Sequence, residues 1–178
     1  MSEPSSTSMD VTDRIRDPQC SQDDLANWAG MNTENDRLIA SHCNVGAETL
    51  KKLSRSEDKK TSENVTSNPN TPLNVLMYLA DDFPRAFLLN PAFDLIFLEE
   101  PVALERLYET TMAKILSQRE CPLPIIDWAY RTYKRKNSYS SYAVLKGVVK
   151  NPNTPDKIIK AILKMRSDTD ISCQETFL

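Results

Sequence analysis

The sequence predicts an all-α fold built from short helical repeats. The five residues Asn-Pro-Asn-Thr-Pro occur twice, at 68–72 and at 151–155, and an apolar run follows each copy at once. No stretch alternates between apolar and polar residues for long enough to indicate a strand. The 11 prolines fall mostly at the borders of the predicted segments. Because a catalytic loop rarely occurs in duplicate, the repeated motif favours a structural repeat.

In both copies the motif is expected to end one helix and to begin the next. A proline restricts the residue before it and favours a turn, and a proline in the first helical position has no N–H to leave unsatisfied. Thr71 and Thr154 are the predicted N-caps. Apolar residues then recur at spacings of three and four, which indicates one helical face. These are Val75, Leu76, Leu79 and Ala80 in the first copy, and Ile158, Ile159, Ile162 and Leu163 in the second.

Two further copies of the motif are more degenerate. Residues 42–53 align with residues 68–79 at an offset of 26, so that Asn44, Leu50 and Leu53 match Asn70, Leu76 and Leu79. Residues 89–98 contain another Asn-Pro turn, which begins 22 residues after Asn68. The predicted repeat is therefore about 22–26 residues long, with some drift.

A first helix is expected ahead of each turn, at 36–42, 59–67, 84–90 and 140–151. Between the third and fourth turns the pattern changes, and longer helices are predicted at 101–118 and 124–136. Two short helices cannot bury their apolar faces alone, whereas stacked pairs can. We therefore expect a helical repeat domain over 21–166, a disordered N-terminal tail over 1–20 and a flexible C-terminal tail over 167–178.

The segments "NPNTPLNVLMYLA" and "VVKNPNTPDKIIKAIL" resemble the variant leucine-rich repeat family of bacterial proteins. In that family two short helices, one of them often a 3₁₀ helix, stack with their neighbours into a right-handed superhelix. The resemblance implies a solenoid of the armadillo and HEAT type, a bacterial origin and no shared catalytic residues. It covers about half of the chain, and residues 101–136 depart from it.

One described member of that family carries an N-terminal iron–sulfur cluster. The four cysteines of this chain are widely scattered, and no two have the Cys-x-x-Cys spacing. They are Cys20, Cys43, Cys121 and Cys173. We therefore expect reduced thiols in a cytoplasmic protein, with no cofactor and no metal.

The composition argues against catalysis and against a membrane partner. The chain has only 3 glycines, none of them clustered as a phosphate-binding loop requires, and its single histidine, His42, is predicted to end a helix. Catalytic triads and zinc sites depend on histidine, so an enzyme is not expected. No apolar run reaches the length of about 18 residues that a membrane span needs.

Charge is unevenly distributed along the chain. Residues 1–100 hold 9 basic and 17 acidic residues, whereas residues 128–166 hold 10 basic residues and a single acid, Asp156. Aromatic residues are interleaved with the cations in "WAYRTYKRKNSYSSY", at 128–142. Cations neutralise phosphates and aromatic rings stack on bases, so this segment is the main candidate for a binding surface.

The candidate partner-binding residues are Trp128, Arg131, Tyr133, Lys134, Arg135, Lys136, Tyr139, Lys146 and Lys150. The alternative is that the tyrosines pack in the core and that the cations are solvated near a helix C-terminus.

The sequence favours a non-catalytic scaffold for protein–protein interaction, built from stacked short helical repeats, whose protein partner it does not identify. The alternative is a nucleic-acid-binding module that uses the basic aromatic surface 128–166.

Overall fold

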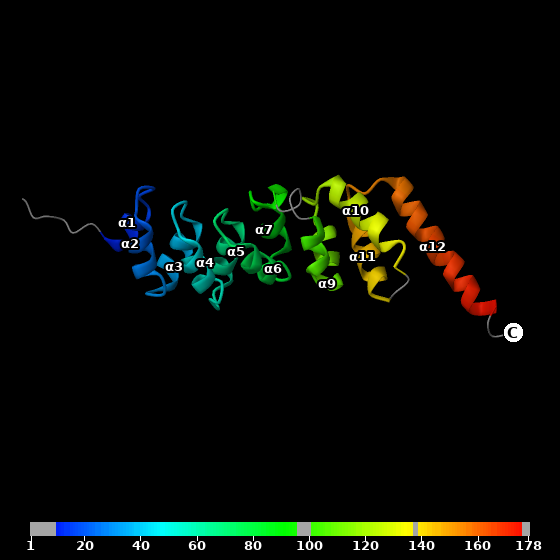
Figure 1. The fold of residues 1–178 in the computed structure, drawn as a ribbon, viewed down its shortest axis with the longest axis horizontal. Helices are drawn as coiled ribbons and strands as arrows, with labels where there is room; N and C mark the ends of the chain where they lie inside the picture. Colours follow the sequence, from blue (N-terminus) through cyan, green and yellow to red (C-terminus); the bar gives the residue numbers. More distant parts are fainter. Residues whose placement is uncertain (1–9, 96–100, 137–138, 176–178) are drawn as a thin grey trace, which may run out of the picture. The chain divides into compact units, whose positions relative to one another are not determined.

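The computed structural model describes residues 10–95, 101–136 and 139–175. All regular secondary structure in these residues is helical, as the sequence predicts, and none of them forms a strand (Figure 1). The chain divides into two compact units, each described here by itself. Of the described residues, unit 1 holds 10–79 and 90–93, and unit 2 holds the remainder.

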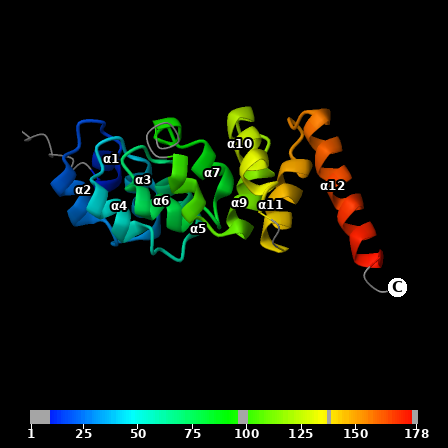
Figure 2. The same cartoon turned by 45° about the vertical axis from the view of Figure 1, so that its right-hand side comes forward.

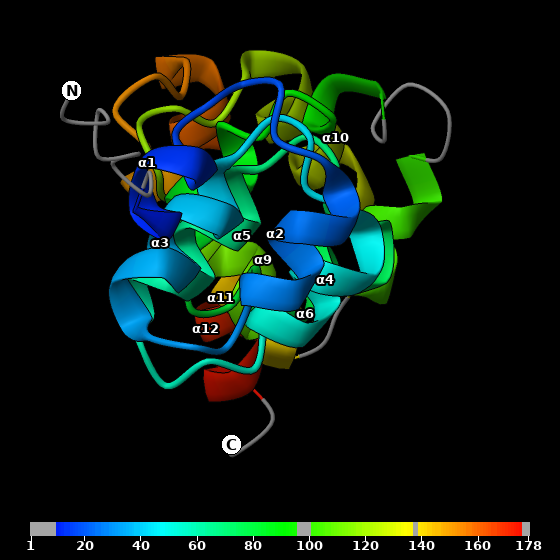
Figure 3. The same ribbon diagram turned by 90° about the vertical axis from the view of Figure 1, so that its left-hand side faces the viewer.

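Unit 1 consists of three consecutive helix pairs. In Figure 3 the first helices of the pairs, α1, α3 and α5, lie on one side, and the second helices, α2, α4 and α6, lie on the other. Their bounds are Val11–Ile15 for α1, Gln22–Trp28 for α2, Thr33–Ser41 for α3, Ala47–Leu53 for α4, Lys59–Ser67 for α5 and Leu73–Leu79 for α6. The core contains the fully buried side chains of Leu25, Ile39, Leu50, Val65 and Leu76.

Unit 2 is built around helix α11. Helices α9, α10 and α12 all pack against α11, and α7 packs against α9 (Figure 2). The bounds are Pro84–Leu88 for α7, Pro101–Arg106 for the 3₁₀ helix η1, Glu109–Leu116 for α9, Leu123–Tyr133 for α10, Tyr139–Lys150 for α11 and Asp156–Glu175 for α12. Met112, Ile115, Leu116, Ile126 and Val144 are fully buried in its core.

The predicted first helices are confirmed, with shifts at their ends. The helix predicted at 59–67 has those bounds, and the one predicted at 140–151 is α11. Helix α3 begins three residues before the predicted start because Asn32 caps it, with Oδ1 accepting from the N–H of Asn35 at 2.8 Å. The helix predicted at 84–90 ends at Leu88, since Asn90 already belongs to the next turn.

The predicted helix over 101–118 is wrong. The chain forms η1 and then α9, and Tyr108 between them is extended (φ −60°, ψ 143°). Leu104 on η1 and Leu107 just after it are buried, as are Met112 and Ile115 on α9. A spacing of three residues suits both a 3₁₀ and an α-helix, so the apolar pattern continues across the break.

The predicted tails also differ from the structure. Residues 11–15, assigned to the N-terminal tail, form α1 and bury Ile15 in the core of unit 1. Helix α12 runs to Glu175, beyond the predicted domain end at 166. The other tail residues, 1–9 and 176–178, lie outside the described part of the chain.

The predicted capping role of Thr71 and Thr154 is replaced by another bond. Each hydroxyl donates to a carbonyl six residues earlier, Val65 O and Val148 O, at 2.6 Å in both cases. The carbonyl of Pro72 accepts from the N–H groups of Val75 and Leu76 in the first turn of α6, so Pro72 occupies the cap position. The threonine therefore stabilises the end of the preceding helix instead of the start of the next.

No described helix combines the length and the apolar composition that crossing a bilayer requires.

Candidate functional site

The geometry that several turns share comes from a buried asparagine side chain. Asn68 is 3% exposed. Its Nδ2 donates to Ala40 O at 2.9 Å and to His42 O at 3.0 Å, both in the preceding turn of unit 1. Its Oδ1 accepts from the N–H of Asn70 at 2.9 Å. One amide therefore forms a hydrogen bond within its own turn and two hydrogen bonds to the main chain at the preceding turn.

Asn90 in unit 1 and Asn151 in unit 2 make the same set of bonds. Each is almost fully buried, and each Oδ1 accepts from the N–H two residues on, at 2.8 Å. The carbonyls that accept from Nδ2 are Thr66 O and Asn68 O for Asn90 (2.7 and 2.9 Å), and Leu116 O and Gln118 O for Asn151 (2.7 and 2.6 Å). We call the residue at this place, the first residue of each turn between helices, the rung residue.

A second asparagine, two residues after the rung, adds further bonds to the preceding turn. Asn70 Nδ2 donates to Cys43 O at 2.7 Å and to Val45 O at 3.1 Å. Asn44 and Asn153 donate in the same way, to Pro18 O and Arg119 O respectively, at 2.7 Å. Both asparagines of the Asn-Pro-Asn motif therefore form side-chain hydrogen bonds to the main chain.

His42 occupies a rung position in unit 1. Its Nε2 lies 2.9 Å from Asp17 O, and its Nδ1 accepts from the N–H of Asn44 at 3.0 Å. Because Nδ1 faces a donor and Nε2 faces an acceptor, the ring is the neutral tautomer with hydrogen on Nε2. The imidazole thus reproduces the acceptor and the donor of an asparagine amide. As predicted, His42 ends a helix, α3, and both ring nitrogens are engaged by main chain.

Two further rung positions were missed in the sequence. Asp17 Oδ1 accepts from the N–H of Gln19 at 2.9 Å, and the side-chain amide of Gln118 donates to Lys114 O of α9, the helix it follows, at 3.2 Å. A carboxylate can accept but cannot donate, so Asp17 shapes a turn without binding an earlier one. Each of these two positions is followed three residues later by a cysteine, Cys20 or Cys121, where the clean motifs have threonine. Both cysteines are buried in the structure.

Two of the predicted aromatic residues, Trp128 and Tyr133, pack within unit 2. Tyr133 is 2% exposed, and burial raises the pKa of its hydroxyl. Trp128 is half-buried, with its ring edge-on to Tyr133 at 6.4 Å between centroids. The ammonium groups of Lys134 and Lys136 lie over the rings of Tyr130 and Tyr133, at 4.8 and 4.6 Å. At these residues the aromatic rings therefore contribute to packing.

Two of the predicted cations have carboxylate partners within unit 2. Arg131 pairs with Asp127 at 2.8 Å along α10, and Lys136 lies 3.8 Å from Glu105 of η1. Arg135 is exposed at the end of α10. The cations of α10 are thus partly neutralised by the unit's own acids.

The remaining candidates lie on α11. Lys146 and Lys150 are exposed one turn apart, and Tyr142, one turn earlier, is 41% exposed. Tyr139 begins this helix, but its side chain lies outside the described part of the structure. Of the predicted residues that the structure describes, Tyr133 is therefore core, whereas the lysines of α11 are exposed.

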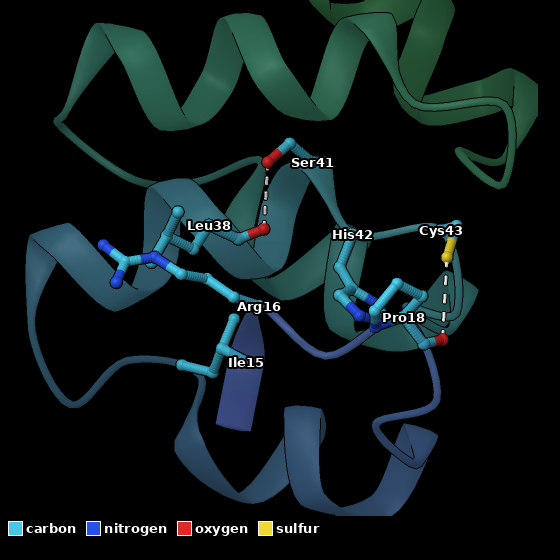
Figure 4. A pocket seen from close by; sticks show the side chains of 7 residues that line it. All are labelled: Ile15, Arg16, Pro18, Leu38, Ser41, His42 and Cys43. Carbon is cyan, nitrogen blue, oxygen red and sulfur yellow. Dashed lines mark hydrogen bonds between the residues drawn. The ribbon is translucent and has the colours of Figure 1, made fainter. Parts of the chain in front are cut away.

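A pocket of about 320 Å³ opens in unit 1 beside helices α1 and α3 (Figure 4). It is lined by Ile15, Arg16, Pro18, Leu38, Ser41, His42 and Cys43. Arg16 bonds to Asp13 at 3.1 Å, and the hydroxyl of Ser41 donates to Leu38 O at 3.0 Å. Since His42 is engaged by main chain, no imidazole base in the pocket activates the exposed Cys43 thiol.

Among the described residues, no group of three histidine, cysteine, aspartate or glutamate side chains could hold a metal ion. Comparison with protein-family models, curated proteins and solved structures found no match to this chain. The family resemblance of the two NPNTP segments stays a prediction, and a function has to be argued from the geometry above.

Proposed function

We propose that this chain is a non-catalytic scaffold that binds another protein through stacked short helical repeats. On this proposal the helix pairs form solenoid segments of the variant leucine-rich repeat kind. The single observation that supports it best is the set of rung residues, which join each turn to the main chain of the preceding one inside a unit. Such bonds fix the spacing of successive helix pairs.

The rungs make the proposed scaffold rigid. A buried side-chain to main-chain hydrogen bond stabilises by about 0.5–1.5 kcal/mol, and leaving its partner unsatisfied costs about 1–3 kcal/mol. Each asparagine rung makes three such bonds in the interior. These bonds satisfy the polar groups of the turns. The outward faces of the helices are therefore the surfaces that would bind a partner.

The second helices of unit 1 offer the best candidate face. Tyr78 on α6 is 73% exposed, although α6 buries Val75, Leu76 and Leu79 in the core. Tyrosine is enriched at protein interfaces because it offers a large apolar area at a small cost in conformational entropy. We therefore place the protein-binding face around Tyr78, on the row of α2, α4 and α6.

The test begins with the tagged full chain in nuclease-treated native lysate, from which bound proteins are identified by mass spectrometry. Each candidate is then purified and titrated calorimetrically against the chain. We expect saturable binding that Tyr78→Ala weakens by tenfold or more, as removal of an interface anchor does. Tyr108→Ala is the matched control, since Tyr108 is also strongly exposed (83%) but lies in unit 2.

Two results would contradict the proposal. One is that no purified candidate binds the chain. The other is that a bound protein is chemically altered during incubation, which would indicate an enzyme. If both tyrosine variants weakened partner binding equally, the binding face could not be assigned to unit 1, but the scaffold function would still stand.

A further inference from the structure

Exposed lysines lie on each of the last two helices of unit 2. Lys146 and Lys150 are exposed on α11, and Lys157 and Lys160 are exposed on α12. With Tyr142 they form what we call the lysine face. In the described part of the chain none of these four lysines pairs with a carboxylate, whereas Lys114 and Lys136 of the same unit do.

The lysine face has almost no acid near it in sequence. Between residues 139 and 165 the only carboxylate is Asp156, against five lysines. Unneutralised cations on neighbouring helices raise the local positive potential and attract anions. The excess of positive charge therefore belongs to α11 and to the first part of α12, up to residue 165, since the cations of α10 and of the residues just after it are partly balanced by Asp127 and Glu105.

The register of α11 puts an aromatic ring in line with the charges. Tyr142, Lys146 and Lys150 are spaced by four residues, so they lie along one side of the helix with about 6 Å between successive positions. The opposite side is buried at Val144, Leu145 and Val148. An extended polyanion lying along this row would contact one aromatic ring and then two ammonium groups.

We propose that the lysine face binds single-stranded nucleic acid, without sequence preference. Lysines neutralise phosphates as point charges, and an exposed tyrosine can stack on any base. A folded protein partner fits less well, because lysine is depleted in the cores of protein interfaces and the α11 row holds no aliphatic anchor. The site goes beyond the scaffold function proposed above and stands or fails separately from it.

The test measures fluorescence anisotropy of labelled 20-nucleotide oligothymidylate and oligouridylate with the full chain, between 50 and 300 mM salt. We expect dissociation constants of about 1–100 µM near physiological salt. With four lysines engaged, log K should fall with log salt at a slope of about −2.8. Similar results for the two oligomers mean that the face does not distinguish DNA from RNA, as phosphate and stacking contacts predict.

The double variant Lys146→Gln/Lys150→Gln should weaken binding and reduce the slope to about −1.4, because two of four phosphate contacts are lost. Lys157→Gln/Lys160→Gln should do the same, which covers the case that one pair of substitutions perturbs folding. Tyr142→Ala should weaken binding about fivefold or more with the slope unchanged, and Tyr142→Phe should bind normally. Circular dichroism melting checks each variant.

The matched control is Arg55→Gln/Lys59→Gln, which removes two exposed cations from unit 1. It should leave both the affinity and the slope unchanged. The proposal is overturned if no oligonucleotide binds at 50 mM salt, or if this control lowers the slope as much as the lysine-face variants do. It is also overturned if a 20-residue polyglutamate binds as tightly and Tyr142→Ala has no effect, since the face would then recognise acidic peptides.

Discussion

The bonds of His42 show how one residue type can replace another at a rung. The ring accepts from Asn44 N–H and donates to Asp17 O, which are the two functions that an asparagine amide has in the other turns. The lone histidine of the chain therefore has a structural explanation, and a change at this site should affect stability before anything else.

We expect His42→Leu to destabilise the protein by about 2 kcal/mol, because it leaves a donor and an acceptor unpaired beside a buried side chain. His42→Asn, which restores the rung chemistry, should lose less than half as much. Urea unfolding followed by circular dichroism measures both. Equal losses in the two variants would show that the ring contributes packing and that its hydrogen bonds add little.

The cysteines of the two units should differ sharply in reactivity. Burial raises the pKa of the Cys121 thiol to about 12, whereas Cys43 is exposed. Since the thiolate is the reactive form, a maleimide at pH 8 should label Cys43 first and leave Cys121 unlabelled until the protein unfolds. Peptide mass spectrometry over a time course checks the order. Labelling of Cys121 before Cys43 in the folded protein would contradict the burial.

Asp58 should make the stability of unit 1 sensitive to acid. The guanidinium of Arg37 donates to both carboxylate oxygens, at 2.6 and 2.9 Å, and Thr61 N–H donates to one of them at 2.8 Å. These bonds, Arg37 first, hold the pKa of Asp58 well below its usual range. A lowered pKa stabilises the fold above the ordinary carboxyl value of about 4, and that contribution is lost as pH falls below it.

The measurement compares the urea midpoints of the wild type and Asp58→Asn between pH 2 and 7. The wild type should be the more stable by a constant margin above about pH 5, and the margin should shrink steadily toward pH 2. A margin that does not change with pH would mean that the Arg37 pair contributes nothing to folding.

At the scale of elements, α9 and α11 pack closely against each other at Gly147. A Cβ on Gly147 would lie 2.5 Å from the carbonyl oxygen of Ala113 and 2.8 Å from its Cα. Helix propensity alone would favour Gly147→Ala by about 1 kcal/mol. A clash with main chain cannot be relieved by a rotamer change, so packing should outweigh propensity.

We therefore expect Gly147→Ala to destabilise the protein by about 1–3 kcal/mol, the usual cost of overpacking. Gly46→Ala is the control, since its Cβ would meet only the movable side chain of Gln22, at 3.2 Å. Differential scanning calorimetry should show a clear drop in Tm for the first variant and a small shift for the second. A Tm rise for Gly147→Ala would mean that the two helices separate readily.

Much of the helical organisation could be predicted from the sequence. The Asn-Pro turns and apolar spacings predicted α5, α6 and α11 to within a few residues, because both signals are local. The break at Tyr108 could not be predicted, since the apolar residues on either side keep the same spacing. Helix α1 was missed because it has only five residues, and its order comes from burial of Ile15 among other helices.

The candidate site was less predictable. Spacing along the chain grouped Tyr133 with Lys146 and Lys150, yet Tyr133 is core and the lysines are exposed. Which aromatic residues are buried depends on how α10 packs against α11, and sequence periodicity within one helix does not determine that packing. The partners of Arg131 and Lys136 likewise became evident only from three-dimensional proximity.

At the scale of the whole molecule, each unit has its own core and its own rungs. In unit 1 the rungs link neighbouring turns only, so a broken rung should loosen its neighbours first. We expect Asn68→Leu to speed amide exchange at residues 40–45 and 66–72, with α11 in unit 2 unaffected. Hydrogen exchange with mass spectrometry gives this resolution. Uniform acceleration across both units would show that the chain opens as a single cooperative body.

The rungs have a consequence for how such a chain can change over evolutionary time. The asparagines of the turns donate to carbonyl oxygens, and a carbonyl is present whatever the side chain of the accepting residue: Pro18, Ala40, Cys43 and Thr66 all serve. A duplicated or deleted repeat would therefore meet a compatible neighbour without any compensating substitution. On the proposed repeat architecture the chain could lengthen, shorten and diverge in sequence, provided that each new copy keeps one residue able to donate to the preceding turn.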